Sequence, residues 1–561
     1  MIGRVLECNA VLWSIALWYR AEVPYSPISP TFSRVFAGST GQDLMKKTCF
    51  ALFVLITVNV LGQDIQGQVF PTDDSVIQNM WEEGMEGGSQ VVDLAQALLD
   101  SIGPRLMGSP GFDAAGDWLI SNYTAWGIDA EKQVYGTWTG WERGYTHLDL
   151  VAPRQRTLEG MILAWSPGTD GPIEGEVIVP PLFTNSDEFE AWLPEVDGRI
   201  VAISLAEPTC REDQSWLDHA TPESFQEMNN ARDEARQAFS MSTRAMGPGA
   251  PERIADAGAI AVLTGRWSAG WGVDKIFSSP TAGIPGVHLS CEDYGLVARL
   301  AERGQSPRIR IDAQAEFFGE VPAFNVVGTI PGTELPNEYV LLSAHLDSWD
   351  GASGATDNGT GTIMMLEAMR ILKATYPNPR RTIMVGHWGG EEQGLIGSTA
   401  FAADNAEVVD GLQAAFNQDN GTWRIDYIRM QGFTGAGAHF GRWFSKIPVE
   451  ITGHIELDIP GIPETGGSDH MSFICKPAPG FRLQSNYPDY RQYTWHTNRD
   501  TFDKIVFADL RNNATLAAML AYQASEDPER VSSETRVLPT DPRGQPGRWP
   551  QCRPPRRSPG G

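Results

Sequence analysis

The sequence predicts an α/β protein, a three-layer sandwich in which helices cover both faces of a mostly parallel central sheet, with a second domain inserted into it. After residue 324 the predicted strands are continuous and apolar, as buried parallel strands are, and they alternate with helices. Between residues 136 and 317 the pattern changes to short β-type runs separated by Pro- and Gly-rich turns. The 561 residues also exceed the roughly 250–300 at which a single core stops growing.

The larger predicted domain is divided by the insert and comprises residues 63–135 and 318–525. Its first part has helical periodicity from residue 75 to about residue 134, interrupted by a Gly- and Pro-rich loop at residues 103–111. The elements expected in its second part are strands at 339–344, 382–385 and 414–418 and helices at 363–372 and 394–403. The insert, residues 136–317, has β-type runs at 175–179, 199–203 and 257–263 and is expected to mix strands with helices.

A signal peptide is predicted at residues 45–62. Two lysines follow Met45, a largely apolar run covers residues 49–61, and small residues precede Gln63, so we expect the mature chain to begin near Gln63. The run is shorter than the ~20 apolar residues that a membrane-spanning helix needs. The alternative is a buried helix or an anchor.

The two ends of the chain are expected to lie outside the folded domains. Residues 1–44 precede the signal peptide and show no clear periodicity, so we interpret them as a non-native or wrongly assigned extension. The tail, residues 526–561, is rich in Pro, Arg and Gly and is predicted to be disordered.

Four cysteines remain after the signal peptide, and they are widely spaced: Cys210, Cys291, Cys475 and Cys552. A disulfide is possible in an exported protein, and the sequence leaves all three pairings open. None of the four forms a C-x-x-C pair, so a cysteine zinc cluster is not supported.

Composition restricts the class of partner. The hydrophobic fraction of 42% and the charged fraction of 20% are those of a folded globular protein. The formal net charge of −27 argues against nucleic acid and against anionic membrane surfaces, because both would repel the chain.

Acidic and histidine residues follow the predicted strands, where open α/β sheets bind their ligands. These residues are His345-x-Asp347, Asp357-Asn358-Gly359, Glu391-Glu392 and Asp419, with a further group at His496. Each has an ordinary interpretation when taken alone: a capping pair, a turn or a solvated face. Their joint order at strand ends predicts a metal site.

The residue types in this group favour zinc, because neutral imidazole and carboxylate oxygen are both good zinc ligands. Two histidines and three carboxylates can hold two ions if one carboxylate bridges them. Successive side chains on an extended backbone point apart, so Glu391 and Glu392 should not both bind the same ion. We expect one to bind metal and the other to face the metal-bound water, which is the division that a metal-assisted hydrolase requires.

Together these motifs resemble those of the zinc exopeptidases of the aminopeptidase and glutamate carboxypeptidase family. The motifs that carry the resemblance are His345-x-Asp347, Asp357-Asn358-Gly359, Glu391-Glu392, Asn417-x-Asp419, Ser468-Asp469-His470 and His496-x-x-x-Asp500-Thr501. The resemblance spans about residues 74–525 and includes an insert similar to a protease-associated domain. Segments 141–144, 344–350 and 432–435 are similar to one member of that family.

The resemblance implies two Zn²⁺ ions bridged by Asp357. It implies His345 and Asp419 as further ligands of one ion, and Glu392 and His496 as further ligands of the other.

It also implies roles for residues that do not bind metal. Glu391 would be the general base that deprotonates the bridging water, and Asp347 would hydrogen-bond the far nitrogen of His345 and fix its tautomer. Asp469 matches a supporting position and His470 is expected to cap or pack. The remaining histidines that match no ligand position, which we treat as ordinary, are His387, His439 and His454.

The function expected from these observations is a secreted or periplasmic two-zinc exopeptidase that hydrolyses small peptides, in particular unblocked dipeptides. Dimeric relatives imply a possible homodimer. The alternatives are an aminopeptidase that trims longer peptides, a glutaminyl cyclase, which works with a single zinc in that family, and a non-catalytic binding protein. The complete set of five ligands favours the two-zinc peptidase.

Overall fold

The computed structural model describes residues 73–419, 421–486, 488–540 and 544–560, all within one compact unit. The predicted signal peptide at 45–62 and the extension at 1–44 lie outside the described residues.

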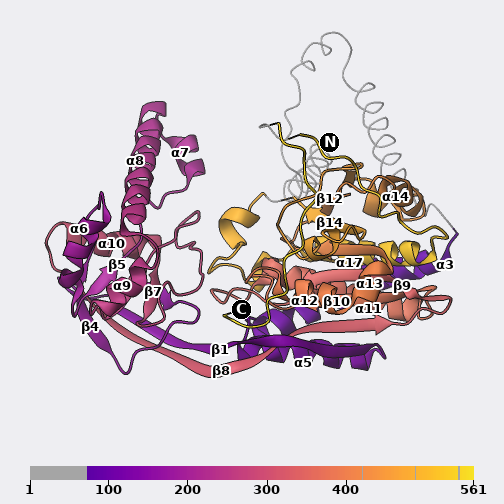
Figure 1. Ribbon diagram of the computed structural model, residues 1–561, viewed down its shortest axis with the longest axis horizontal. Helices are drawn as coiled ribbons and strands as arrows, with labels where there is room; N and C mark the ends of the chain where they lie inside the picture. The colour runs from indigo at the N-terminus through magenta and orange to yellow at the C-terminus, as the bar shows by residue number, and fades with distance from the viewer. Residues whose placement is uncertain (1–72, 420, 487, 541–543, 561) are drawn as a thin grey trace, which may run out of the picture. The chain divides into compact units, whose positions relative to one another are not determined.

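A mostly parallel sheet forms the centre of the larger domain (Figure 1), as predicted. From one edge to the other its strands are β13 (Glu456–Leu457), β12 (Ile425–Arg429), β14 (Gly480–Ser485), β11 (Leu412–Gln418), β9 (Leu335–His345), β10 (Arg381–Trp388), β8 (Arg308–Ile330) and β1 (Asp129–Ala152). The four central strands β14, β11, β9 and β10 are parallel, whereas β8 and β1 on one side and β12 on the other pair antiparallel with their neighbours.

Both faces of this sheet are covered, so the domain has three layers. Along β9, Val340 and Leu342 belong to one buried cluster and Leu341 to another, which is the period-two alternation of a strand buried on both sides. Helices that contribute to the first cluster are α3 (Ser75–Trp81), α4 (Val91–Gln96), α5 (Pro110–Ala125), α11 (Thr360–Thr375), α14 (Ala436–Phe444), α15 (Val449–Thr452) and α17 (Phe507–Glu526). Helices that contribute to the second are α12 (Ile396–Asp404), α13 (Ala406–Asp410) and α16 (Met471–Ile474), and of these α12 and α16 also contribute residues to the first.

The segment between β1 and β8 forms a smaller sheet, which is continuous with the larger one because its first strand in spatial order, β4 (Ile173–Ile178), pairs antiparallel with β8. Its strand order is β4, β5 (Ile200–Ala202), β6 (Ala261–Thr264), β7 (Gly286–Leu289) and β3 (Gly160–Ile162), parallel from β4 to β7. A two-residue strand, β2 (Arg156–Thr157), pairs with β1. The helices of this segment are α6 (Ser186–Trp192), α7 (Asp213–His219), α8 (Pro222–Met246), α9 (Ala250–Asp256) and α10 (Cys291–Glu302). Buried residues alternate between two clusters here as well, so this insert also has two covered faces.

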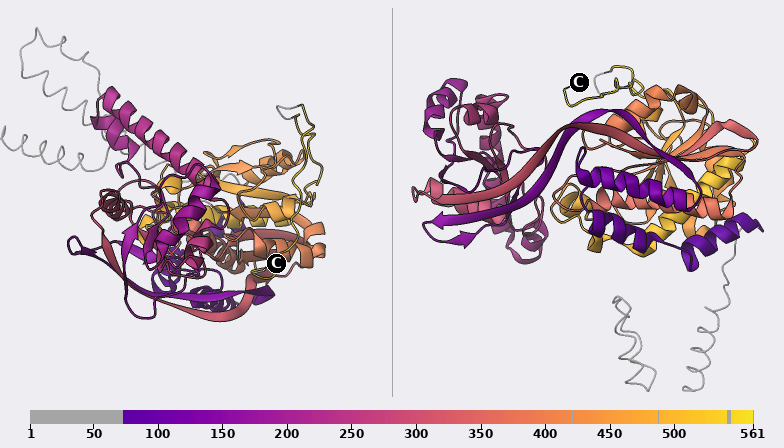
Figure 2. Two further views of the ribbon diagram at one scale, coloured as in Figure 1. Left: turned by 60° about the vertical axis from the view of Figure 1, so that its left-hand side comes forward. Right: turned by 90° about the horizontal axis from the view of Figure 1, so that it is seen from below.

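The insert is joined to the larger domain by a continuous pair of strands rather than by linkers. Figure 2 shows β1 and β8 running side by side along one long curved ribbon. Both expected boundaries, at residues 136 and 317, fall inside these strands. The ladder has register shifts between Val134 and Gly136 and between Gly140 and Trp141, and Trp141 pairs with Phe317.

Residues 129–134 differ from the helical pattern predicted for them. The helix α5 ends at Ala125, and β1 begins at Asp129. Pairing of this stretch with residues 324–329 of β8 satisfies its backbone, and this tertiary pairing outweighs the local pattern.

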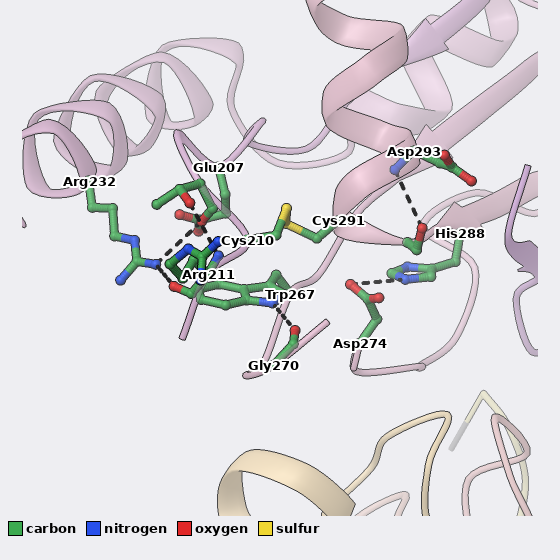
Figure 3. The surroundings of a disulfide bond; sticks show 12 residues. Glu207, Cys210, Arg211, Arg232, Trp267, Gly270, Asp274, His288, Cys291 and Asp293 are labelled. Atoms are coloured by element: carbon green, nitrogen blue, oxygen red, sulfur yellow. Dashed lines mark hydrogen bonds and ion pairs between the residues drawn. A yellow bond between two sulfur atoms is a disulfide. The ribbon is translucent and has the colours of Figure 1, made fainter. Parts of the chain in front are cut away.

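The tail also differs from its prediction, because the described parts of residues 526–561 pack against the larger domain. Cys552 forms a disulfide with Cys475, Trp549 Nε1 donates to the backbone oxygen of Ile474 at 2.6 Å, and Val531 is buried in the main core. A covalent cross-link and an aromatic anchor compensate for a composition that is poor in apolar residues. A second disulfide joins Cys210 to Cys291 in the insert (Figure 3).

Candidate metal centre

The five predicted ligands come from the strand ends of the central sheet and from two loops beside them. His345 is the last residue of β9, Asp419 follows the end of β11, and Glu392 lies four residues after the end of β10. Because these three strands are adjacent and parallel, their carboxyl ends meet at one edge of the sheet. Asp357 lies in the turn before α11, and His496 follows the short helical segment Tyr490–Thr494.

The side chains of these residues form two groups that share Asp357. In the first group, His345 Nε2 lies 3.2 Å from Asp419 Oδ1 and 3.5 Å from Asp357 Oδ1. In the second, His496 Nε2 lies 2.8 Å from Glu392 Oε2 and 3.2 Å from Asp357 Oδ2. Within each group the candidate ligand atoms all lie within 4.8 Å of one another, so each could hold one ion.

An unpaired buried oxygen supports the fit of cations to this cluster. Glu392 Oε1 is buried and has no hydrogen-bond partner among the described residues. A buried carboxylate oxygen without a donor carries a large desolvation cost unless a cation binds it. The combination of two imidazoles and three carboxylates is that of a zinc site.

The electrostatics of the cluster show an excess of negative charge. Although burial opposes it, the Glu392 carboxylate raises the pKa of His496 to about 9. Burial, with the Asp357 carboxylate acting in the same direction, raises the pKa of Glu392 to about 7. The imidazoles therefore hold protons that bound cations would replace, so metal binding should release protons.

Glu391, the predicted base, belongs to neither ligand group. Burial raises its pKa well above the ordinary value for glutamate, and the nearby carboxylates of Asp419 and Asp469 act in the same direction. A carboxylate with a raised pKa accepts a proton near neutral pH and can pass it on, which suits a general base.

Asp347 holds the backbone on which both glutamates lie. Its Oδ1 accepts a hydrogen bond from the Glu391 amide at 3.1 Å, and its Oδ2 accepts one from the Glu392 amide at 3.2 Å. The nearest acceptor of His345 Nδ1 is the backbone oxygen of Asp347 at 2.9 Å, whereas the Asp347 carboxylate is 3.6 Å away. The Asp347 carboxylate is therefore closer to the amides of Glu391 and Glu392 than to the imidazole of His345, which is the partner that the resemblance implied.

The turn that carries Asp357 is held in a similar way by Asp500. This buried carboxylate accepts hydrogen bonds from the backbone amides of Thr356 at 2.8 Å and Asp357 at 3.0 Å. Burial raises its pKa to about 7. The sequence motif contained Asp500 but gave it no role.

Arg105, in the loop at residues 103–111, was not identified from the sequence as a site residue. Its side chain is fully buried and donates to the backbone oxygens of Leu346 at 2.7 Å, Ser353 at 2.6 Å and Gly354 at 2.9 Å. These contacts fix the segment between His345 and Asp357. The guanidinium also places a positive charge near the carboxylates of the cluster, although burial lowers its pKa to about 10.

Four of the histidines that were not predicted as ligands have ordinary partners. His470 Nε2 lies 3.0 Å from Glu464 Oε2, and His387 lies 2.6 Å from the Tyr123 hydroxyl. His439 contacts Asp527 of the tail, and His454 contacts a backbone oxygen.

Comparisons with known proteins indicate a zinc metallo-exopeptidase. Residues 325–521, which contain all five candidate ligands, match the family model described as peptidase family M28. The chain is 27% identical to carboxypeptidase Q of Rattus norvegicus over 444 residues, which cover 77% of this chain and 85% of that protein.

Two solved structures show the same fold. One is a peptidase M28 precursor from Shewanella amazonensis SB2B, with a TM-score of 0.59 and 23% identity over 83% of this chain and 99% of that one. The other is a zinc aminopeptidase from Bacillus subtilis, with a TM-score of 0.51 and 18% identity over 79% of this chain and 96% of that one.

Proposed function

We propose that this chain is a secreted two-zinc enzyme that cleaves small unblocked peptides, above all dipeptides. The starting point is its class, a zinc metallo-exopeptidase whose residues 325–521 match the model of peptidase family M28. The observation that carries the proposal is the pair of ligand groups that share Asp357. His345 and Asp419 would complete one zinc site, and Glu392 and His496 the other.

When bound, zinc would polarise the scissile carbonyl and lower the pKa of a coordinated water. The chain's own contribution is proton transfer and positioning. Glu391 would take the proton of the attacking water and later give it to the leaving amine, and its raised pKa suits both steps. Asp347 would keep the Glu391 carboxylate in place through the Glu391 backbone amide.

Charge at the site supports a preference for a free amine. A protonated amine gains charge-assisted contacts with the carboxylates around the ligand groups, and an acetylated nitrogen does not. A closed site also discriminates strongly against a substrate that leaves its polar groups unpaired.

Arg266 of the insert could bind the opposite end of the peptide. Its guanidinium lies 4.2 Å from the centre of the Phe277 ring, and that ring lies 5.2 Å from the imidazole of His496. Among the described residues, no carboxylate lies within ion-pair distance of Arg266, so its charge is available to a C-terminal carboxylate. Such a contact would favour short peptides, because only these place both ends near the metals.

The test is zinc content together with cleavage of a substrate panel: a dipeptide, its acetylated form, its C-terminal amide and a hexapeptide. We expect two zinc ions per chain, and we expect the free dipeptide to be the only substrate of the panel that is cleaved efficiently. Stepwise trimming of the hexapeptide would instead favour a broader aminopeptidase. Efficient cleavage of the acetylated dipeptide would exclude both and indicate a true carboxypeptidase. One zinc with no peptidase activity would favour the glutaminyl cyclase alternative.

Export is supported by the two disulfides, since such bonds persist mainly in oxidising compartments. Among the described residues, no helix has the length and apolar character needed to cross a membrane. A homodimer stays a prediction, which sedimentation of the purified protein would check.

A further inference from the structure

The loop that carries His496 is held by a segment of the insert, residues 272–276. The backbone amide of Ile276 donates to the backbone oxygen of His496 itself at 2.9 Å. The Lys275 ammonium donates to the backbone oxygens of Trp495 at 2.8 Å and Arg491 at 3.0 Å. The ligand and the residues before it are therefore bound through their main chain.

Asn498 extends this contact on the other side of His496. Its side-chain oxygen accepts from the Asp274 amide at 3.0 Å, its backbone amide donates to the Asp274 oxygen at 3.0 Å, and its side-chain nitrogen donates to the Gly272 oxygen at 3.0 Å. Three hydrogen bonds from one residue fix the position of the loop relative to the insert segment.

The insert segment is itself anchored in the small sheet. The Asp274 side chain is fully buried and faces His288 of β7, with 3.6 Å between His288 Nε2 and Asp274 Oδ1 (Figure 3). Contacts thus run without interruption from β7 through Asp274 and Asn498 to the loop of His496.

The conformation of His496 explains why its loop needs this support. His496 has a φ of +58°, in the left-handed region that residues other than glycine rarely adopt. Such a conformation is energetically unfavourable and persists only where the surroundings impose it. His345, by contrast, is part of β9, and its position follows from the central sheet.

We propose that residues 272–276 of the insert are a positioning element for the second metal. On this proposal, affinity at the group of Asp357, Glu392 and His496 depends on the insert. Affinity at the group of His345, Asp357 and Asp419 depends only on the larger domain. The proposal rests on the two-zinc function argued above, and it gives the insert a role in building the metal centre.

The experiment compares zinc affinities in the full-length mature chain by titration against a competing chelator, with zinc content measured after dialysis. Asn498→Ala removes the two side-chain hydrogen bonds of Asn498 and keeps the one from its backbone amide, and Lys275→Met removes the two hydrogen bonds of the Lys275 ammonium. We expect either variant to weaken one zinc by about 10–100-fold, the usual effect of losing an outer partner of a ligand, and to leave the other unchanged.

A matched control is Arg499→Met, which breaks the exposed pair of Arg499 with Glu159 next to this contact and should change neither affinity. To assign the weakened ion, Asn498→Ala is combined with His496→Ala, which removes a ligand of the second site. In that background Asn498→Ala should have no further effect on the remaining zinc.

Unchanged affinities in both Asn498→Ala and Lys275→Met would overturn the proposal, as would equal weakening of both ions. A wild-type chain that binds fewer than two zinc ions would instead contradict the proposed function, so the two failures are distinguishable.

Discussion

Replacing Asp347 with asparagine is expected to slow turnover and weaken the second zinc while leaving the first zinc unchanged. The structure gives the reason, since the two carboxylate oxygens accept one hydrogen bond each from the amides of Glu391 and Glu392. The asparagine side chain keeps one acceptor oxygen but presents an NH₂ group to the other amide. One of the two glutamates therefore loses its support.

The size of the effect follows from the loss of one hydrogen bond to a charged group. Such bonds contribute about 1.5–3 kcal/mol, and the Asp347 side chain is fully buried, so water does not readily replace the missing acceptor. At about 1.4 kcal/mol per factor of ten, this corresponds to a decrease of roughly 10–100-fold in kcat/KM or in second-zinc affinity.

The assay is steady-state cleavage of a free dipeptide together with chelator titration of zinc in Asp347→Asn. The matched control is Asp500→Asn, which makes the same chemical change beside the shared ligand Asp357. Because Asp357 belongs to both groups, Asp500→Asn should weaken both ions, whereas Asp347→Asn should weaken only one.

The first-zinc affinity of Asp347→Asn is the decisive quantity, and it is measured in a His496→Ala background that lacks the second site. The second-zinc affinity is measured in Asp347→Asn alone. If the first-zinc affinity falls and the second-zinc affinity is unchanged, the 3.6 Å approach of the Asp347 carboxylate to His345 is the contact that matters. Unchanged zinc binding and unchanged turnover would show that Asp347 has neither role.

Three further outcomes are expected. Glu391→Gln should retain both zinc ions and lower kcat by about 10²–10⁴-fold, whereas Glu392→Gln should lower zinc content, and equal zinc loss in both would contradict the assigned roles. Replacing Cys475 and Cys552 together by serine should destabilise the packed tail by about 2–5 kcal/mol, visible as rapid proteolysis of the tail under conditions where the wild-type tail resists. Sequencing the N-terminus of the exported protein should give Gln63, and retention of residues 49–61 would refute the predicted cleavage.

The fold and the candidate ligands could be predicted because both depend on local pattern. Apolar strands followed by acidic or histidine residues leave a direct mark in the sequence, and parallel neighbours bring their ends together. His345 and Asp419 lie 3.2 Å apart in the structure although 74 residues separate them, because β9 and β11 are adjacent.

Contacts to backbone atoms leave no comparable mark. Arg105 donates to backbone oxygens, which every residue possesses, so no partner residue in the sequence indicates its role. The tail was misjudged for a related reason. Composition describes an average tendency to bury apolar surface, whereas one disulfide at Cys552 and one anchored ring at Trp549 hold the described parts in place.

The contact between the insert and the His496 loop also uses backbone atoms and therefore leaves no mark in the sequence. It bears on the role of the insert. Each hydrogen bond between residues 272–276 and this loop has a main-chain atom on at least one side and joins residues more than 200 positions apart, so neither periodicity nor motif spacing could indicate them. A domain that only covered the site would need contacts only with the rim of the site. Here the Ile276 amide donates a hydrogen bond to the backbone oxygen of His496, a candidate ligand whose own conformation is unfavourable. The free energy that holds His496 in place is therefore supplied partly by the insert, and loading of the second zinc should depend on whether the insert is folded against the loop.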